Sequence, residues 1–200
     1  MSGEMIAAVE HADLTPERLN LVEAELRTVL GRLTGRAQGW VRAAAGVPVA
    51  FGRAVRAAGR ELAVVTPTQG MVPALLPERD RAAVGELVSL GQQVRLLAYD
   101  PADREGCVGA DERMIAECRQ LFALWVGSPS NGRDATAHLV AYARARGVPV
   151  EVVWPEGAAR EAIPGGPVRD AGRRHRDSSR PSTTVAPQPT PITREANQPR

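Results

Sequence analysis

Apolar residues in the first 154 positions fall into short continuous runs separated by longer stretches with helical spacing. The runs are rich in Val, Leu and Ala and show little alternation with polar residues, which is typical of strands that are buried on both faces. We therefore predict six strands, at Met5–Val9, Trp40–Ala45, Glu61–Val65, Val94–Ala98, Leu121–Val126 and Val148–Trp154.

The stretches between these runs predict five helices. The first begins at Pro16, with Thr15 as a hydroxyl N-cap, and ends before Gly35. The others are predicted at Pro48–Ala58, Glu78–Leu90, Ala110–Arg119 and Ala135–Arg146. Residues 68–77 and 100–109 are expected to form loops, and Asp111 and Glu112 are interpreted as favourable acids in a first helical turn.

Strands that are separated by helices of ten or more residues indicate a parallel sheet with helices on both faces. The predicted fold class is α/β, a three-layer sandwich around a mostly parallel sheet of five or six strands. This domain is expected to span residues 1–164.

The chain changes character after Pro164, where Arg, Ser, Thr, Pro and Gln dominate and apolar residues are scarce. Residues 165–200 are therefore predicted to be a disordered tail, because such a segment cannot bury enough surface to offset its ordering entropy. The tail holds seven of the 25 basic residues but three of the 23 acids, which leaves 18 arginines against 20 acids before it. Nucleic-acid binding is not expected of a mildly acidic domain.

Several classes of protein are disfavoured by what the sequence lacks. Cys107 and Cys118 form no CxxC or Cys/His cluster, so they are interpreted as small hydrophobic residues, and no metal site is predicted. A signal peptide and an apolar run long enough for a membrane helix are both missing. We expect a cytoplasmic protein that has no membrane partner.

In parallel α/β sheets, ligands bind beyond the carboxyl ends of the strands. Three predicted loops lie there: the one after Val9, the one that begins at Thr66, and the one from Gly127 to Thr136. The third loop offers hydroxyls, amides and a cation at a helix start, and it predicts an anion site. Its candidate ligand-binding residues are Gly127, Ser128, Ser130, Asn131, Gly132, Arg133 and Thr136. Loops of this composition also serve as ordinary turns and caps, and this alternative stays open.

The other two loops supply fewer candidates. His11 is interpreted as a general acid or base, or as a ligand contact, and alternatively as a polar cap on the first strand. Glu10 is the second candidate for catalysis, and Thr66 is a third point of ligand contact. No nucleophile elbow, Walker loop, GxGxxG or zinc spacing is present, so no cofactor is predicted.

The region from Asp111 to Arg160 resembles the bacterial SLOG superfamily, Rossmann-like domains that include DNA-processing protein A and the LOG phosphoribohydrolases. The resemblance lies in Leu-Phe-Ala-Leu-Trp-Val-Gly, a small-residue loop, Ala-Thr-Ala, and Gly-Val-Pro-Val-Glu-Val-Val-Trp-Pro-Glu-Gly-Ala. It implies a Rossmann-like fold and a pocket for a nucleotide-derived ligand. In that pocket, the Ser128–Thr136 loop would contact a phosphate or sugar. Related folds often pair through helix faces, which suggests a homodimer.

The chain departs from the pattern of this superfamily at positions that matter for chemistry. Ala7, Ala8 and Glu10 stand where relatives have glycines, and Val126 stands where they have an acid. Asp134-Ala135-Thr136-Ala137-His138 replaces Gly-Gly-Thr-Ala-Asp. These changes remove a polar group and add Cβ atoms close to the expected ligand. They favour an altered site over an intact enzyme.

Three hypotheses follow from the sequence. The first is a degenerate, non-catalytic SLOG-like domain that binds a nucleotide-derived small molecule. The second is a hydrolase or transferase of the base–sugar bond in nucleosides or nucleotides, with His11 or Glu10 as acid or base. The third is an interaction scaffold that acts through the basic tail.

Overall fold

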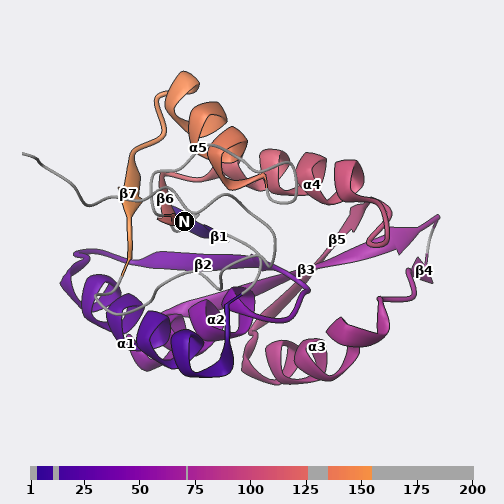
Figure 1. Cartoon of the computed structure of the whole chain (residues 1–200), viewed down its shortest axis with the longest axis horizontal. Helices are drawn as coiled ribbons and strands as arrows, with labels where there is room; N and C mark the ends of the chain where they lie inside the picture. Colours follow the sequence, from indigo (N-terminus) through magenta and orange to yellow (C-terminus); the bar gives the residue numbers. More distant parts are fainter. Residues whose placement is uncertain (1–3, 11–13, 71, 126–134, 155–200) are drawn as a thin grey trace, which may run out of the picture. The chain divides into compact units, whose positions relative to one another are not determined.

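The computed structural model describes residues 4–10, 14–70, 72–125 and 135–154. Within these segments the chain alternates between strands and helices, as Figure 1 shows. No helix in the described segments is long and apolar enough to cross a membrane.

The strands form one mixed sheet. In the order β4-β3-β2-β1-β6-β7, each strand is hydrogen-bonded to the next, and β5 pairs with β3. All pairs are parallel except β3 with β4. The strands are β1 (Glu4–Glu10), β2 (Ala37–Arg42), β3 (Glu61–Gln69), β4 (Val72–Pro73), β5 (Gln93–Ala98), β6 (Gln120–Leu124) and β7 (Val150–Val152). The mostly parallel α/β fold is confirmed, with the two-residue β4 as a seventh strand.

The helices of the described segments cover both faces of this sheet. They are α1 (Pro16–Arg32), α2 (Val47–Ala57), α3 (Glu78–Leu90), α4 (Arg104–Glu117) and α5 (Thr136–Ala145). In Figure 1, α1, α2 and α3 lie below the sheet, whereas α4 and α5 lie above it. This is the expected three-layer arrangement.

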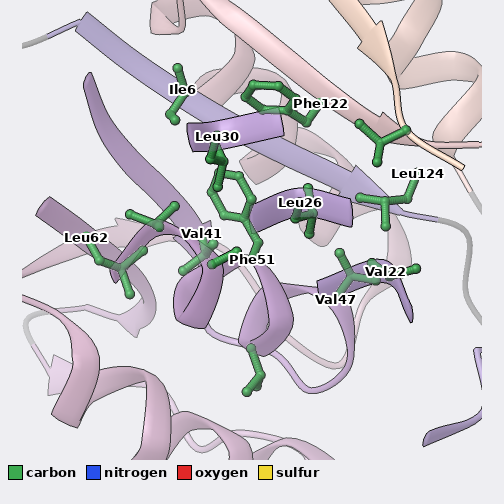
Figure 2. Packing of buried hydrophobic residues seen from close by; sticks show 14 of the residues in the cluster. Ile6, Val22, Leu26, Leu30, Val41, Val47, Phe51, Leu62, Phe122 and Leu124 are labelled. Carbon is green, nitrogen blue, oxygen red and sulfur yellow. The ribbon is translucent and has the colours of Figure 1, made fainter. Parts of the chain in front are cut away.

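Each face of the sheet has its own hydrophobic core. The core below the sheet packs Leu26 and Leu30 of α1 and Phe51 of α2 against the strands, as Figure 2 shows. The rings of Phe51 and Phe122 lie 6.3 Å apart between centroids. Above the sheet, Ile115 and Leu139 pack against Leu121. Because aromatic residues are few, branched aliphatic side chains supply most of this buried volume.

Strand β2 begins three residues earlier than the sequence predicts and ends at Arg42. The predicted Trp40–Ala45 is therefore wrong at both ends. Gly39, a poor strand former, stands just before the predicted start. In the structure it lies in β2 where a Cβ atom would come within 2.6 Å of a methyl group of Val55, so the close approach of α2 requires a glycine.

Strand β3 continues through Thr66-Pro67, where the sequence predicts its end. Proline is tolerated because β2 ends opposite Val65, so no neighbouring β2 residue needs an N–H from Pro67. The Pro67 carbonyl instead accepts a hydrogen bond of 2.8 Å from the Ala74 amide. The predicted loop 68–77 thus contains a tight hairpin to β4, with Gly70 at φ +65°.

Helix α4 begins at Arg104, six residues before the predicted start. Asp103 is its N-cap, and the Asp103 carboxylate accepts a hydrogen bond of 2.8 Å from the Gly106 amide. The interpretation of Asp111 and Glu112 as first-turn acids is therefore wrong, because both lie in the helix interior. The predicted irregular segment 100–109 is largely helical for the same reason.

Smaller differences concern the ends of other elements. Thr15 is the N-cap of α1 by position, but its side chain makes no capping hydrogen bond. Gly35 and Gly147 have φ of +83° and +72°, as expected of residues that follow a helix. The strand predicted at Val148–Trp154 is shorter because the Val148 amide bonds to Ala143 and closes α5.

Candidate functional site

The strongest candidate for a ligand site is the carboxyl edge of the sheet at β1 and β6. These two strands are hydrogen-bonded neighbours, and Glu10, the last residue of β1, pairs with Leu124, the last of β6. The chain leaves β1 toward α1 below the sheet and leaves β6 toward α5 above it. Strands whose connections diverge in this way form the topological switch point at which α/β domains bind ligands.

The structure therefore brings two of the three predicted loops to neighbouring strands. The residues within these loops lie outside the described segments: His11, Gly127, Ser128, Ser130, Asn131, Gly132 and Arg133. Their roles as ligand contacts, and the catalytic roles of His11 and Glu10, stay predictions.

Thr136 is the first residue of α5 and is 1% exposed. It lies where the chain returns from the loop after β6, at the N-terminal end of the helix. Ala135 precedes it as the N-cap residue and has no side-chain oxygen that could cap the helix. The start of α5 thus lacks the usual side-chain acceptor at its N-cap.

Thr66 is displaced from this point. It belongs to β3, which is separated from β1 by β2, so its backbone lies about 10 Å from β1 at ordinary strand spacing. The Thr66 Oγ1 atom is buried and has no hydrogen-bond partner within the part of the chain that the structure describes. A buried hydroxyl without a partner is uncommon. The role of Thr66 as a ligand contact stays a prediction.

A buried polar cluster lies on the upper face, at the carboxyl end of β2. The Nε of Arg42 donates a hydrogen bond of 3.0 Å to Oδ1 of Asp111 in α4, and the two side chains are 23% and 15% exposed. Nη1 of Arg42 lies 3.7 Å from the Cys107 sulfur. The Tyr99 hydroxyl is buried nearby without a hydrogen bond of good geometry. A guanidinium is thus held at this edge by α4.

The burial of this cluster shifts its titrations. Loss of water raises the pKa of Asp111, although Arg42 opposes the shift. Desolvation is the largest single effect on Arg42 and lowers its pKa, but Asp111, Cys107 and Tyr99 together outweigh it and raise that pKa overall. Burial also raises the pKa of Tyr99 and of the Cys107 thiol. None of these shifts produces a reactive thiolate or a phenolate near neutral pH.

The loop between β2 and α2 is a second structural feature of this edge. Gly46 has φ +85° and precedes α2. The Ala45 amide donates a hydrogen bond of 2.9 Å to Oδ1 of Asp80, a buried residue in the first turn of α3. Asp80 therefore fixes this loop in place from a neighbouring helix.

The sequence interpretation missed both the Arg42 cluster and Asp80. Alternation of Gln38, Trp40 and Arg42 on one face of β2 was the available signal for Arg42. Recognition of Asp103 as an N-cap would have placed Asp111 in the helix interior, where a buried acid needs a partner. Asp80 bonds to a residue 35 positions away, and no local pattern indicates such a contact.

The remaining candidates for chemistry are structural. Cys118 is 6% exposed within the upper core, and burial raises the pKa of its thiol to about 11. The His138 ring bonds to Glu112 at 2.6 Å with its side chain 56% exposed. No group of His, Cys, Asp and Glu residues in the described segments could hold a metal ion.

Comparisons with known proteins show what this architecture resembles. No family model and no curated protein matches the chain. DNA processing protein A (DprA) from Streptococcus pneumoniae is similar in structure, with 13% identity and a TM-score of 0.54. The match covers 75% of this chain and 50% of that one, so the chain spans half the length of DprA. This likeness shows a Rossmann-like fold.

Two further structures match the chain at TM-scores of 0.48. One is the molybdenum cofactor carrier protein from Chlamydomonas reinhardtii, with 16% identity and 76% of each chain covered. The other is the molybdenum cofactor binding protein from Rippkaea orientalis, with 12% identity, covering 78% of this chain and 79% of that one.

Some of the positions at which the sequence departs from the SLOG pattern lie in the described segments. Ala7 and Ala8 lie within β1, and Ala7 is 1% exposed. Ala135 has φ −105°, a conformation open to any residue, so the loss of a glycine there causes no backbone strain. Val126 and Asp134 lie outside the described segments. An alanine at position 135 is therefore accommodated without strain in the backbone.

Proposed function

We propose that this SLOG-type domain binds a nucleotide-derived small molecule at the carboxyl ends of β1 and β6 and does not catalyse a reaction on it. The observation that supports this most is the pairing of Glu10 with Leu124, together with the divergence of α1 and α5 to opposite faces. This arrangement sets two loop entrances side by side at a switch point.

The expected mode of recognition is an anion contact near the start of α5. The N–H groups of a first helical turn and the positive end of the helix dipole favour a phosphate at such a place. In this proposal the hydroxyls of Ser128 and Ser130 and the guanidinium of Arg133 contribute further contacts. Thr66, about two strands away, is within the length of a nucleotide and contacts its other end.

The residues present near the proposed site do not favour catalysis. Val126 replaces an acid that would orient a sugar, and His138 replaces another. His138 is bonded to Glu112 on α4. The described cluster at β2 keeps its guanidinium bound to Asp111. These features support binding without a positioned general acid or base.

Isothermal titration of the full chain with nucleoside mono-, di- and triphosphates tests the binding. At least one ligand is expected to bind, and the double change Ser128→Ala with Ser130→Ala is expected to weaken it about tenfold, the effect of losing hydrogen bonds to a charged group. Ser89→Ala is the matched control, since the Ser89 hydroxyl donates within α3 and is exposed. Silence across the panel contradicts the proposal.

Incubation with nucleoside monophosphates, followed by chromatography for free base, tests the absence of catalysis. No base is expected to appear. Release of base by the natural sequence, and its loss on His11→Ala, would favour the base–sugar hydrolase instead. Base release that His11→Ala leaves unchanged would exclude His11 from the reaction.

A further inference from the structure

Strand β5 exposes an unpaired edge. Among the described segments it pairs with β3 and with no other strand. The Ala43 amide donates to the Val65 carbonyl at 2.8 Å, so odd-numbered residues of β3 face β2 and even-numbered ones face β5. Val64 is in register with Val94, and in a parallel pair its N–H and C=O groups bond to the residues on either side of Val94, so Gln93, Arg95 and Leu97 face β3. The backbone groups of Val94, Leu96 and Ala98 therefore point away from the sheet. These three residues offer a row of donors and acceptors to a further strand.

An apolar strip accompanies this edge. Val94 and Leu96 are 49% and 58% exposed, and the pairing of Val94 with Val64 puts both on the lower face of the sheet. Val88 in the last turns of α3 is 45% exposed. Large apolar side chains exposed beside a free strand edge mark a site of association.

The usual protection against association is weak here. Proteins guard strand edges with charged side chains, prolines or bulges. The charged residue of β5 is Arg95, and its guanidinium lies 5.6 Å from the ring centroid of Trp40 on the upper face. It also donates a hydrogen bond of 3.0 Å to Gln93 of the same strand. Arg95 is thus held over its own sheet and leaves the edge uncovered.

We propose that β5 pairs with β5 of a second copy of this chain, antiparallel, about a two-fold axis that passes through Leu96. A two-fold axis perpendicular to the sheet keeps the lower faces of both copies on one side, so residues of equal parity meet. With Leu96 on the axis, Arg95 lies opposite Leu97 of the second copy and Val94 lies opposite Ala98.

Repulsion between arginines favours the register with Leu96 on the axis over the register with Arg95 on the axis. A shift that places Arg95 on the axis sets two guanidinium groups directly opposite each other, and such like-charge pairs are destabilising. With Leu96 on the axis, each Arg95 faces a leucine and not a second arginine, and the outward backbone groups of Leu96, and of Val94 with Ala98, exchange hydrogen bonds between copies. The two exposed leucines then cover each other.

The size of this contact predicts a weak dimer. Val88, Val94 and Leu96 are only about half exposed, and three such side chains are a small contact beside the ~800 Å² per partner of a standard stable interface. We therefore expect dissociation in the micromolar range and a monomer–dimer equilibrium that depends on concentration.

Sedimentation velocity of the full chain across a hundredfold range of concentration tests the assembly. A shift from monomer to dimer is expected, and Leu96→Arg is expected to abolish it by placing two charges on the axis. Leu75→Arg is the matched control, because Leu75 is 79% exposed and belongs to the loop after β4. A monomer at all concentrations, or a dimer that Leu96→Arg leaves intact, overturns the proposal.

Disulfide trapping tests the register. The two Leu96 residues on the axis form a hydrogen-bonded antiparallel pair, whose Cα atoms lie about 5.5 Å apart, the usual distance across a disulfide. Leu96→Cys is therefore expected to give a covalent dimer under mild oxidation, far faster than Val94→Cys. The natural sequence controls for Cys107 and Cys118. Equal trapping at positions 94 and 96 overturns the Leu96 axis.

Discussion

The ion pair between Arg42 and Asp111 is an interaction of single residues that the local sequence does not predict. Both residue types are visible in the sequence, but their partnership spans 69 positions and depends on where α4 begins. Burial imposes a desolvation penalty on each charged group, and the hydrogen bond between the two groups offsets part of that penalty. The intact pair therefore adds little net stability, but removal of one partner alone destabilises the domain.

The change Asp111→Ala is expected to destabilise the domain by about 3 kcal/mol, because it leaves the Arg42 guanidinium largely buried without a counter-charge. Urea unfolding followed by circular dichroism measures this loss. Simultaneous replacement by apolar residues, Arg42→Met with Asp111→Leu, is expected to recover most of it.

Glu112→Ala is the control for the Asp111 change. Glu112 is the next residue of the same helix, and its partner His138 is mostly exposed, so the expected loss is under about 1 kcal/mol. If Asp111→Ala and Glu112→Ala lower the free energy of unfolding equally, the burial of the Arg42–Asp111 pair does not affect stability.

Elements with strong local signals are the ones that the sequence predicts well. Helix α3 has the predicted bounds, and the starts of β3 and α1 are also as predicted. Errors arise where a distant element decides a local conformation. Gly39 belongs to a strand because Val55 needs the space, and Pro67 continues a strand because β2 has already ended. Neither condition is readable from neighbouring residues.

Gly39→Ala is expected to destabilise the protein by about 1–3 kcal/mol, because the added methyl group would overlap a rigid Val55 side chain and displace α2. Thermal or urea unfolding measures the effect. Gly31→Ala is the matched change in α1, where a Cβ atom meets nothing within 4 Å.

The control is expected to be neutral or to stabilise by up to about 1 kcal/mol, since alanine is the better helix former. Opposite signs for the two glycine changes are therefore the expected result. A Gly39→Ala variant as stable as the natural sequence would mean that β2 and α2 are less tightly packed than the structure indicates.

At the scale of the whole molecule, the sequence predicts the layers but not their order. Alternating strands and helices indicate a parallel sheet, and they place the candidate loops at one edge. That β1 lies between β2 and β6 is decided by which strands pair across more than a hundred residues. This order sets the loop after Glu10 beside the loop after Leu124 and leaves Thr66 apart, a distinction that local patterns cannot make.

The two cores differ in size, and the difference should govern how the domain opens. Among the described residues, the core under α1 and α2 holds about twice as many buried hydrophobic side chains as the one under α4 and α5. Regions with fewer buried contacts open at lower free energy. In native-state hydrogen exchange, the amides of α4 and α5 are therefore expected to take up deuterium before those of α1 and α2. The helical layer that carries the proposed anion contact would then open at lower free energy than the opposite layer. Earlier exchange in α1 than in α4 and α5 would contradict this expectation.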